Sequence, residues 1–270
     1  RVRPRYAPIH LGESAGSQRG ADFRPARVAP AQRCHVDAGG TLITAGAWHR
    51  AQAYPRAGET IADAVNREAA HVRHAVGMVD VSTLGKIALV GPDAPEVVNR
   101  LYANGMKTLP PGKARYGLML REDGLVLDDG TVARLADTRY LLTTTTAHAA
   151  SVLVHIEYLL ETAWPDLRAA VASVSDHWAT FAIAGPNSRE VLAALFPDED
   201  VSNEAIPFLA VREVIYAGQS MLITRNSYSG ERAYEVYSPA DYGEAMWQRA
   251  LEVGAPYGLA PYGTEAMGVL

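Results

Sequence analysis

The stretch IALVGPDAPEVVNRLYANG, residues 87–105, returns in altered form as FAIAGPNSREVLAALFPDE, residues 181–199. Both stretches begin with an apolar run, pass through Gly-Pro and continue with apolar residues at helical spacing. Equivalent residues lie 94 positions apart, and the same offset continues further along the chain. The matched pairs are Gly91 with Gly185, Pro92 with Pro186, Glu96 with Glu190, Leu101 with Leu195, Gly124 with Gly218 and Tyr140 with Tyr234. One supersecondary unit therefore occurs twice.

Each copy of this unit is predicted to run strand, helix, two strands around a glycine turn, strand and helix. Asp93 and Asn187 are the expected N-caps of the first helices. This order favours an α+β fold with an antiparallel or mixed sheet and helices on one face. Because Gly-Pro occurs in both copies, we interpret it as a structural turn and not as a phosphate cradle. The predicted segments are residues 87–90, 116–120, 125–135, 140–144 and 147–161 in the first copy, and 181–184, 211–216, 220–225, 234–237 and 242–253 in the second.

The bulk composition is that of an ordinary soluble protein. The chain has 270 residues, a formal net charge of −5 and one cysteine, Cys34. This length can bury a large core, and one cysteine excludes an internal disulfide. No run approaches about 18 apolar residues, so no membrane segment is predicted. The negative net charge argues against a nucleic-acid partner. We expect a cytoplasmic protein.

The two ends of the chain differ from its middle. Residues 1–25 are rich in arginine, proline, glycine and serine without periodicity, which is typical of a linker or wrapping arm. A basic arm for an anionic partner is the alternative to a solvated leader. The last residues, YGTEAMGVL, are typical of a helix start, so we expect the natural protein to continue beyond Leu270.

Several common chemistries have no motif in this chain. There is no G-x-G-x-x-G after a strand, no Walker loop and no Cys or His pair at zinc spacing, so no flavin, NAD or metal site is predicted here. His71 and His74 share a helix face without a third ligand and are interpreted as surface residues. NSYSGE contains serines but no nucleophile elbow, which argues against a hydrolase.

The segment GLVLDDGTVARL, residues 124–135, contains the first candidate for chemistry. If residues 125–135 form one strand, the alternation of faces places Asp129 among Leu125, Leu127 and Leu135. Burial in apolar surroundings would raise the pKa of that carboxyl. The alternative is that residues 128–130 form a hairpin turn between two short strands.

The second candidate is Glu235, which shares a strand face with Ala233 and Tyr237. It is either an ordinary solvent-facing residue or a bidentate acceptor for a flat heterocycle. A pterin edge presents an N–H and an NH₂ side by side, and a carboxylate accepts both. Tyr116, Tyr228 and Tyr237 are candidates to stack on or cap such a ring.

Several longer motifs resemble one known family. MVDVSTLGKIALVGPDA, YGLMLREDGLVLDDG, SYSGERAYEV and PYGTEAM are together similar to the glycine-cleavage T-protein (aminomethyltransferase) superfamily. RYGLMLREDG, LLTTTT, WPDLR and YGTEAM resemble in particular its sarcosine oxidase α-subunit branch, in the C-terminal half of that subunit. The resemblance extends from about Arg24 to Leu270.

The resemblance implies a GcvT-like fold of two ferredoxin-like, folate-binding halves around a central folate. One half is discontinuous: residues 26–75 plus 176–270 form the first domain, and residues 76–175 form the second. A small C-terminal β-barrel domain of the family would follow the end of this chain and is missing from it.

The family pattern also implies site residues. The second aspartate of its DD pair corresponds to Asp129, which would act in catalysis beside the folate nitrogens. Its pterin-binding glutamate corresponds to Glu235, seven residues after Tyr228. Folate-lining positions fall on the remaining residues Leu84, Tyr116, Thr144 and Thr145.

The implied function is capture of a one-carbon unit. Tetrahydrofolate held here would take up an oxidised N-methyl group as 5,10-methylenetetrahydrofolate. Flavin and NAD would belong to other parts of a sarcosine oxidase, including a flavin-bearing partner subunit. The isolated chain is expected to be inactive.

Three other functions stay open at this point. They are a stand-alone aminomethyltransferase, a dimethylglycine oxidase or dehydrogenase module, and a non-catalytic folate-binding or scaffold domain. Met267 stands where the T-protein pattern has an arginine, which disfavours the first of these.

Overall fold

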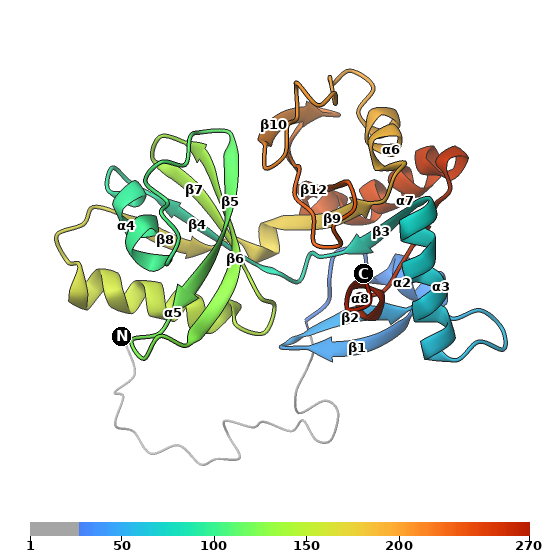
Figure 1. Cartoon of the computed structure of the whole chain (residues 1–270), viewed down its shortest axis with the longest axis horizontal. Coiled ribbons are helices and arrows are strands. Elements are labelled where there is room, and N and C mark those ends of the chain that lie inside the picture. Colours follow the sequence, from blue (N-terminus) through green and yellow to red (C-terminus); the bar gives the residue numbers. More distant parts are fainter. Residues whose placement is uncertain (1–26) are drawn as a thin grey trace, which may run out of the picture.

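The computed structural model describes residues 27–270, so the predicted arm at residues 1–25 lies outside the described residues. Figure 1 shows two lobes side by side, each built on its own sheet. A five-stranded sheet forms one lobe and a six-stranded sheet the other, with a separate two-stranded hairpin beside the second. The prediction of an α+β fold with two ferredoxin-like halves is confirmed.

The five-stranded sheet has the order β5-β6-β7-β4-β8 and is antiparallel throughout. Two helices, α4 and α5, pack apolar residues onto one face of this sheet. Five residues in π-helical geometry, Leu159–Ala163, continue α5. The elements are β4 (Gly85–Val90), α4 (Ala94–Leu101), β5 (Lys113–Leu120), β6 (Val126–Ala136), β7 (Arg139–Thr144), α5 (Ala149–Tyr158) and β8 (Ala170–Ser173).

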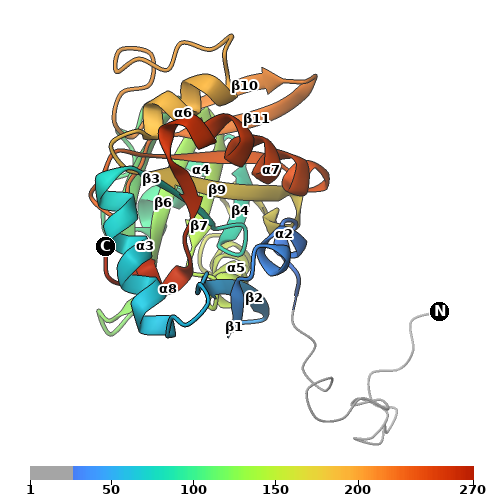
Figure 2. The same ribbon diagram turned by 90° about the vertical axis from the view of Figure 1, so that its right-hand side faces the viewer.

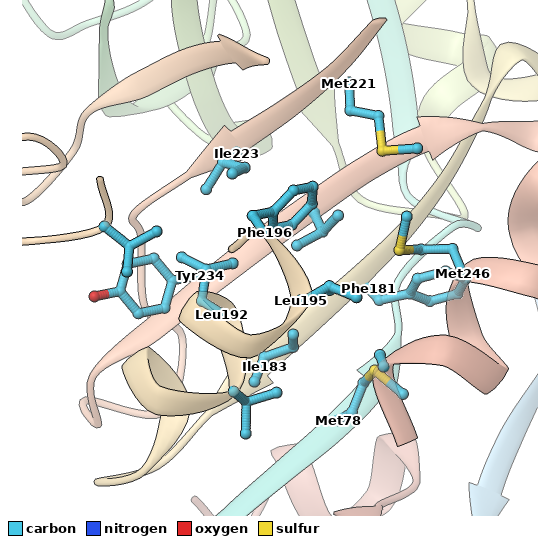
Figure 3. Close-up of a cluster of buried hydrophobic side chains, with 14 of the residues drawn as sticks. Met78, Phe181, Ile183, Leu192, Leu195, Phe196, Met221, Ile223, Tyr234 and Met246 are labelled. Carbon is cyan, nitrogen blue, oxygen red and sulfur yellow. The ribbon is translucent and has the colours of Figure 1, made fainter. Parts of the chain in front are cut away.

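The six-stranded sheet has the order β10-β11-β12-β9-β3-β13, with one parallel pair between β13 and β3. Helices α6 and α7 cover one face of this sheet (Figure 2). The core between the helices and the sheet includes the buried side chains of Phe181, Phe196 and Met246 (Figure 3). The elements are β3 (Val76–Asp80), β9 (Trp178–Ala184), α6 (Ser188–Leu195), β10 (Val211–Tyr216), β11 (Gln219–Thr224), β12 (Ala233–Pro239), α7 (Gly243–Gly254) and β13 (Leu259–Pro261).

The membership of β3 changes the predicted domain boundary. Residues 76–175 were predicted as one continuous domain, but β3 bonds to β9 and β13 in the other sheet. The chain therefore leaves the six-stranded sheet after Asp80, enters the five-stranded sheet with β4 and returns with β9. Strand β3 is buried along its whole length, so pairing on both edges fixes its place.

The two copies of the repeat have the same strand pairing. Ala88 pairs with Leu141 between β4 and β7, and Ala182 pairs with Glu235 between β9 and β12, an offset of 94 in both partners. The offset also holds in the next hairpin, where Gly117 pairs with Gly130 and Val211 pairs with Thr224, but it is lost between the two strands after that. Strand β6 runs to Ala136 and turns tightly, whereas β11 ends at Thr224 and a loop of residues 225–232 leads to β12.

The Gly-Pro turns are structural, as predicted. Gly91 and Gly185 have φ values of 136° and 129°, which side chains rarely adopt. A Cβ atom on Gly91 would lie 2.3 Å from the carbonyl oxygen of Arg168. The helices after these turns begin at Ala94 and Ser188, but neither Asp93 nor Asn187 makes a side-chain capping bond. The Asp93 carboxylate instead accepts two hydrogen bonds from Arg168.

The segment before β3 completes the six-stranded lobe. The hairpin of β1 (Thr41–Ala45) and β2 (Trp48–Ala53) contacts α8 (Thr264–Met267), and α3 (Ile61–His74) contacts both. Helix α2 (Gln32–Asp37) packs against α7. A capping box between Thr60 and Asp63 starts α3. Among residues 27–270 no helix combines the length and apolar character that crossing a bilayer requires.

Candidate functional site

The two sheets meet through an interdomain cluster of six buried residues. Each sheet contributes three of them from the face opposite its helices. Backbone hydrogen bonds of 2.8 Å join the edge strands β5 and β10, from Ala114 N to Leu209 O and from Val211 N to Gly112 O. The members of the interdomain cluster are Ala114, Ala133, Leu141, Val211, Leu222 and Tyr237. Both candidate carboxylates lie on the sheet faces that form it.

Asp129 lies within strand β6, so the alternative of a turn at residues 128–130 is wrong. It shares its face with Thr131 and with Ala133 of the interdomain cluster. The Tyr116 hydroxyl, on β5, donates a hydrogen bond of 2.7 Å to Asp129 Oδ2. This bond raises the pKa of Tyr116. The strand pairing thus holds a phenol and a carboxylate together on an accessible face.

The predicted burial of Asp129 is wrong, because Asp129 is exposed and its neighbour Asp128 is buried. The physical reason is a β-bulge. Met119 pairs with Asp128 and Leu120 pairs with Val126, so Leu127 is an extra residue that breaks the alternation of faces. The positions of Leu125 and Leu127 therefore do not predict on which face of the sheet Asp129 lies.

Asp128 anchors the turn that follows β7. Its Oδ2 accepts a hydrogen bond of 3.1 Å from the backbone N–H of Thr145, and its Oδ1 lies 3.2 Å from Nδ1 of His148. A buried carboxylate needs such partners, since unpaired burial of a charge is costly. Asp128 thus fixes the segment with Thr144 and Thr145 onto β6.

Glu235 lies half-buried on β12 with the facing predicted from sequence. Tyr234 and Val236 point into the helix-side core, whereas Tyr237 joins the interdomain cluster. The Tyr237 hydroxyl donates a hydrogen bond of 2.7 Å to Glu235 Oε2, while Oε1 accepts none from the described residues. Burial, reinforced by Glu235, raises the pKa of Tyr237 well above its ordinary value. Tyr237 is fully buried and cannot stack on a ligand, which corrects that expectation.

Lys86 is a feature that our sequence reasoning missed. It is 0% exposed on β4, and its Nζ donates to the carbonyl oxygens of Ser82 at 2.9 Å and Leu84 at 3.1 Å. Burial lowers the pKa of Lys86 to about 8, and the nearby charge of Glu235 opposes that effect. Lys86 therefore binds the loop that contains Leu84, and its ammonium lies close enough to Glu235 for the two charges to interact. The available signal was a lysine in the otherwise apolar run GKIALV.

The remaining predicted residues lie at the end of a strand or in loops. Leu84 is half-buried against the cluster under α3, and Thr144 is buried with its hydroxyl bonded to the carbonyl of Thr145. Tyr228 is 76% exposed in the loop between β11 and β12. A groove lined by Arg139, Trp178 and Glu213 contains none of the predicted site residues. Residues 27–270 contain no group of three or more metal-ligating side chains.

Two ferredoxin-like sheets that meet through the faces opposite their helices form an aminomethyltransferase type of fold. The glycine cleavage system aminomethyltransferase T of Bartonella henselae has a solved structure with a TM-score of 0.76, 24% sequence identity and coverage of 89% of this chain and 60% of that one. A chain of the heterotetrameric sarcosine oxidase of Corynebacterium sp. U-96 has a TM-score of 0.51 and 14% identity, with coverage of 73% and 93%. At these identities the likeness concerns the fold alone.

The sequence relationship is more specific. Residues 31–270 match the GCVT N-terminal domain, so the chain belongs to that family. It is 45% identical to the sarcosine oxidase subunit alpha of Rhizobium meliloti (strain 1021) over an alignment of 271 positions that covers 99% of this chain and 27% of that protein. It is 31% identical to the aminomethyltransferase of Bacillus subtilis (strain 168), with coverage of 86% and 60%. The chain thus spans about a quarter of the length of the α-subunit relatives that it matches.

Proposed function

We propose that this chain is the tetrahydrofolate-binding, one-carbon-accepting module of a sarcosine oxidase. Its substrate is the oxidised N-methyl group, either as an iminium or as formaldehyde, and its product is 5,10-methylenetetrahydrofolate. The observation that carries the proposal is the pair of carboxylates, Asp129 and Glu235, on the two sheet faces that meet at the interdomain cluster. The 45% identity to a sarcosine oxidase subunit alpha supports the choice of reaction.

The side chains present fit a reduced pterin. Glu235 forms no ion pair within the described residues, and its Oε1 is free of protein donors. A carboxylate with one free oxygen and one shared with a phenol can accept the N–H and NH₂ groups of a pterin edge. Leu84, Tyr116, Thr144, Thr145 and Tyr228 complete the proposed folate-binding set.

Asp129 has the electrostatic role in this proposal. Bound tetrahydrofolate supplies two nucleophilic nitrogens, which take up one carbon with release of water or of the amine. Asp129 stabilises positive charge that develops during this uptake, and Tyr116 orients the carboxylate through its hydroxyl. A flavin on a partner subunit would accept two electrons from the N-methyl amine, whose own methyl group would provide the oxidised carbon, and any NAD would lie elsewhere in the assembly.

The test separates binding from catalysis. Calorimetric titration with tetrahydrofolate should give binding that weakens at least about tenfold in Glu235→Gln, since one charge-assisted hydrogen bond is worth about 1.5–3 kcal/mol. Asp129→Asn should keep folate binding and lose methylenetetrahydrofolate formation in the assembled oxidase. Glu122→Gln, in the exposed turn after β5, is the control.

Two results would contradict the proposal. If Glu235→Gln and the wild type bind tetrahydrofolate equally, Glu235 is not the pterin carboxylate. If Asp129→Asn leaves product formation unchanged, the module is a folate-binding scaffold without chemistry of its own.

A further inference from the structure

Arg50 is a half-buried cation without an acidic partner among residues 27–270. It lies on β2, and its one side-chain contact of hydrogen-bond type is from Nη2 to the sulfur of Met267 at 3.9 Å. Its Nε is buried and has no hydrogen-bond partner in the described part of the chain. A methionine sulfur is a weak acceptor and cannot neutralise a guanidinium.

Other arginines of low exposure do have hydrogen-bond or ion-pair partners in this structure. Arg67 has a side chain 27% exposed and lies 2.8 Å from Glu59. Arg134 is 16% exposed and donates to the carbonyl oxygens of Leu109 and Asp137. A guanidinium stays charged in proteins, and its burial without a partner costs several kcal/mol. The isolation of Arg50 therefore indicates an anion that this part of the chain does not supply.

The contact of Arg50 with Met267 places it near the proposed folate site, because Met267 packs against the same buried cluster as Leu84. Asp80 acts on its charge, but both Asp80 oxygens are already engaged, Oδ2 by His35 Nε2 and Oδ1 by Ser82 N, each at 2.8 Å. The charges of both Arg50 and Glu235 shift the pKa of buried Lys86. Arg50 and Glu235 are thus both among the charges that act on this lysine.

We infer that Arg50 binds a carboxylate of a ligand at this site, in the bidentate geometry that guanidinium and carboxylate share. This inference rests on the proposed function and extends it to a second polar anchor. Two reactants of that function contain a carboxylate: the glutamyl part of tetrahydrofolate, and the amino-acid part of an N-methyl amine. The same guanidinium chemistry would recognise either one.

The experiment compares the wild-type chain with Arg50→Met, Arg50→Lys and the control Arg56→Met, which removes an exposed arginine just after the same hairpin. Calorimetric titrations use three probes: tetrahydrofolate, tetrahydropteroate without its glutamyl part, and glycine. Arg50→Met should weaken a carboxylate-bearing probe at least about tenfold, with partial recovery in Arg50→Lys. If Arg50→Met weakens the binding of tetrahydrofolate but not of tetrahydropteroate, Arg50 binds the glutamyl carboxylate. If it weakens the binding of glycine, Arg50 binds the carboxylate of the amino acid.

Thermal unfolding without ligand gives an independent readout. A cation kept for a ligand is a burden to the free protein, so Arg50→Met should unfold at the same or a higher temperature than the wild type. Unfolding well below that of Arg56→Met would show a structural role and overturn the inference.

The outcomes also separate this inference from the proposed function. Tetrahydrofolate and glycine binding that are both unchanged in Arg50→Met would overturn the role of Arg50 and leave the function standing. If the wild type binds glycine through Arg50 but does not bind tetrahydrofolate, the proposed function is overturned and the role of Arg50 stands. Binding of neither probe by the wild type would overturn both.

Discussion

The buried ammonium of Lys86 makes the stability of this protein depend on pH in a defined direction. Burial lowers the pKa of Lys86 from its ordinary 10.5 to about 8. Below pH 8 the lysine is charged in both states, and the native state bears the cost of burying that charge. Between these two pKa values the unfolded lysine keeps a proton that the native one has released, so the free energy of unfolding rises with pH. The full difference corresponds to about 3 kcal/mol.

Lys86→Met removes this effect, and a comparison with the wild type isolates it from all other titrations. Urea denaturation at about pH 7 and about pH 10.5 should show the wild type gaining about 3 kcal/mol relative to the variant. The control is Lys107→Met, which removes a lysine with a side chain 65% exposed. The difference in the free energy of unfolding between Lys107→Met and the wild type should change by less than about 0.5 kcal/mol between the two pH values. A difference for Lys86→Met that is the same at both pH values would refute the reasoning.

Three further predictions follow from the hydrogen bonds of the site and its support. Asp128→Ala removes a buried carboxylate that holds the backbone N–H of Thr145 and the ring of His148, and should cost about 1–3 kcal/mol in urea denaturation, whereas exposed Asp129→Ala should cost less than about 1 kcal/mol. Asp129→Asn should lower the pKa of Tyr116 towards 10.0, seen by phenolate absorbance against a Tyr116→Phe background; no shift would mean that the bond does not form in solution. Glu68→Ala removes a buried acceptor of two backbone N–H groups and should cost about 3 kcal/mol, with Glu122→Ala as an exposed control.

Local sequence signals were sufficient for much of this fold. Residues 211–216 were predicted as a strand with the bounds that β10 has, because an apolar alternation ends at a glycine turn. Strands β3, β8 and β13 were not predicted as strands. They are short, and pairing with a neighbour far away in sequence defines them.

The site was less accessible to sequence reasoning for the same physical reason. Period-2 alternation gave the correct face for Glu235 but the wrong environment for Asp129, since a bulge at Leu127 is a property of pairing with β5. The burial of Lys86 depends on carbonyl groups of the preceding loop, which no spacing rule describes. Arg50 was not singled out because a single arginine in a strand has no pattern.

The two copies of the repeat differ at positions where the fold does not require a particular side chain. Glu235 and Leu141 occupy equivalent positions in the two copies, and each faces the interdomain cluster from the same register. Lys86 and Thr180 are likewise equivalent, and both are buried. At each of these two positions, one of the copies thus satisfies the same backbone geometry with an uncharged residue. The fold therefore does not require the carboxylate or the ammonium, and both charges lie near the junction of the two sheets. Since burying charge costs free energy that an apolar residue would not, these departures from the repeat favour a ligand as the reason for their presence.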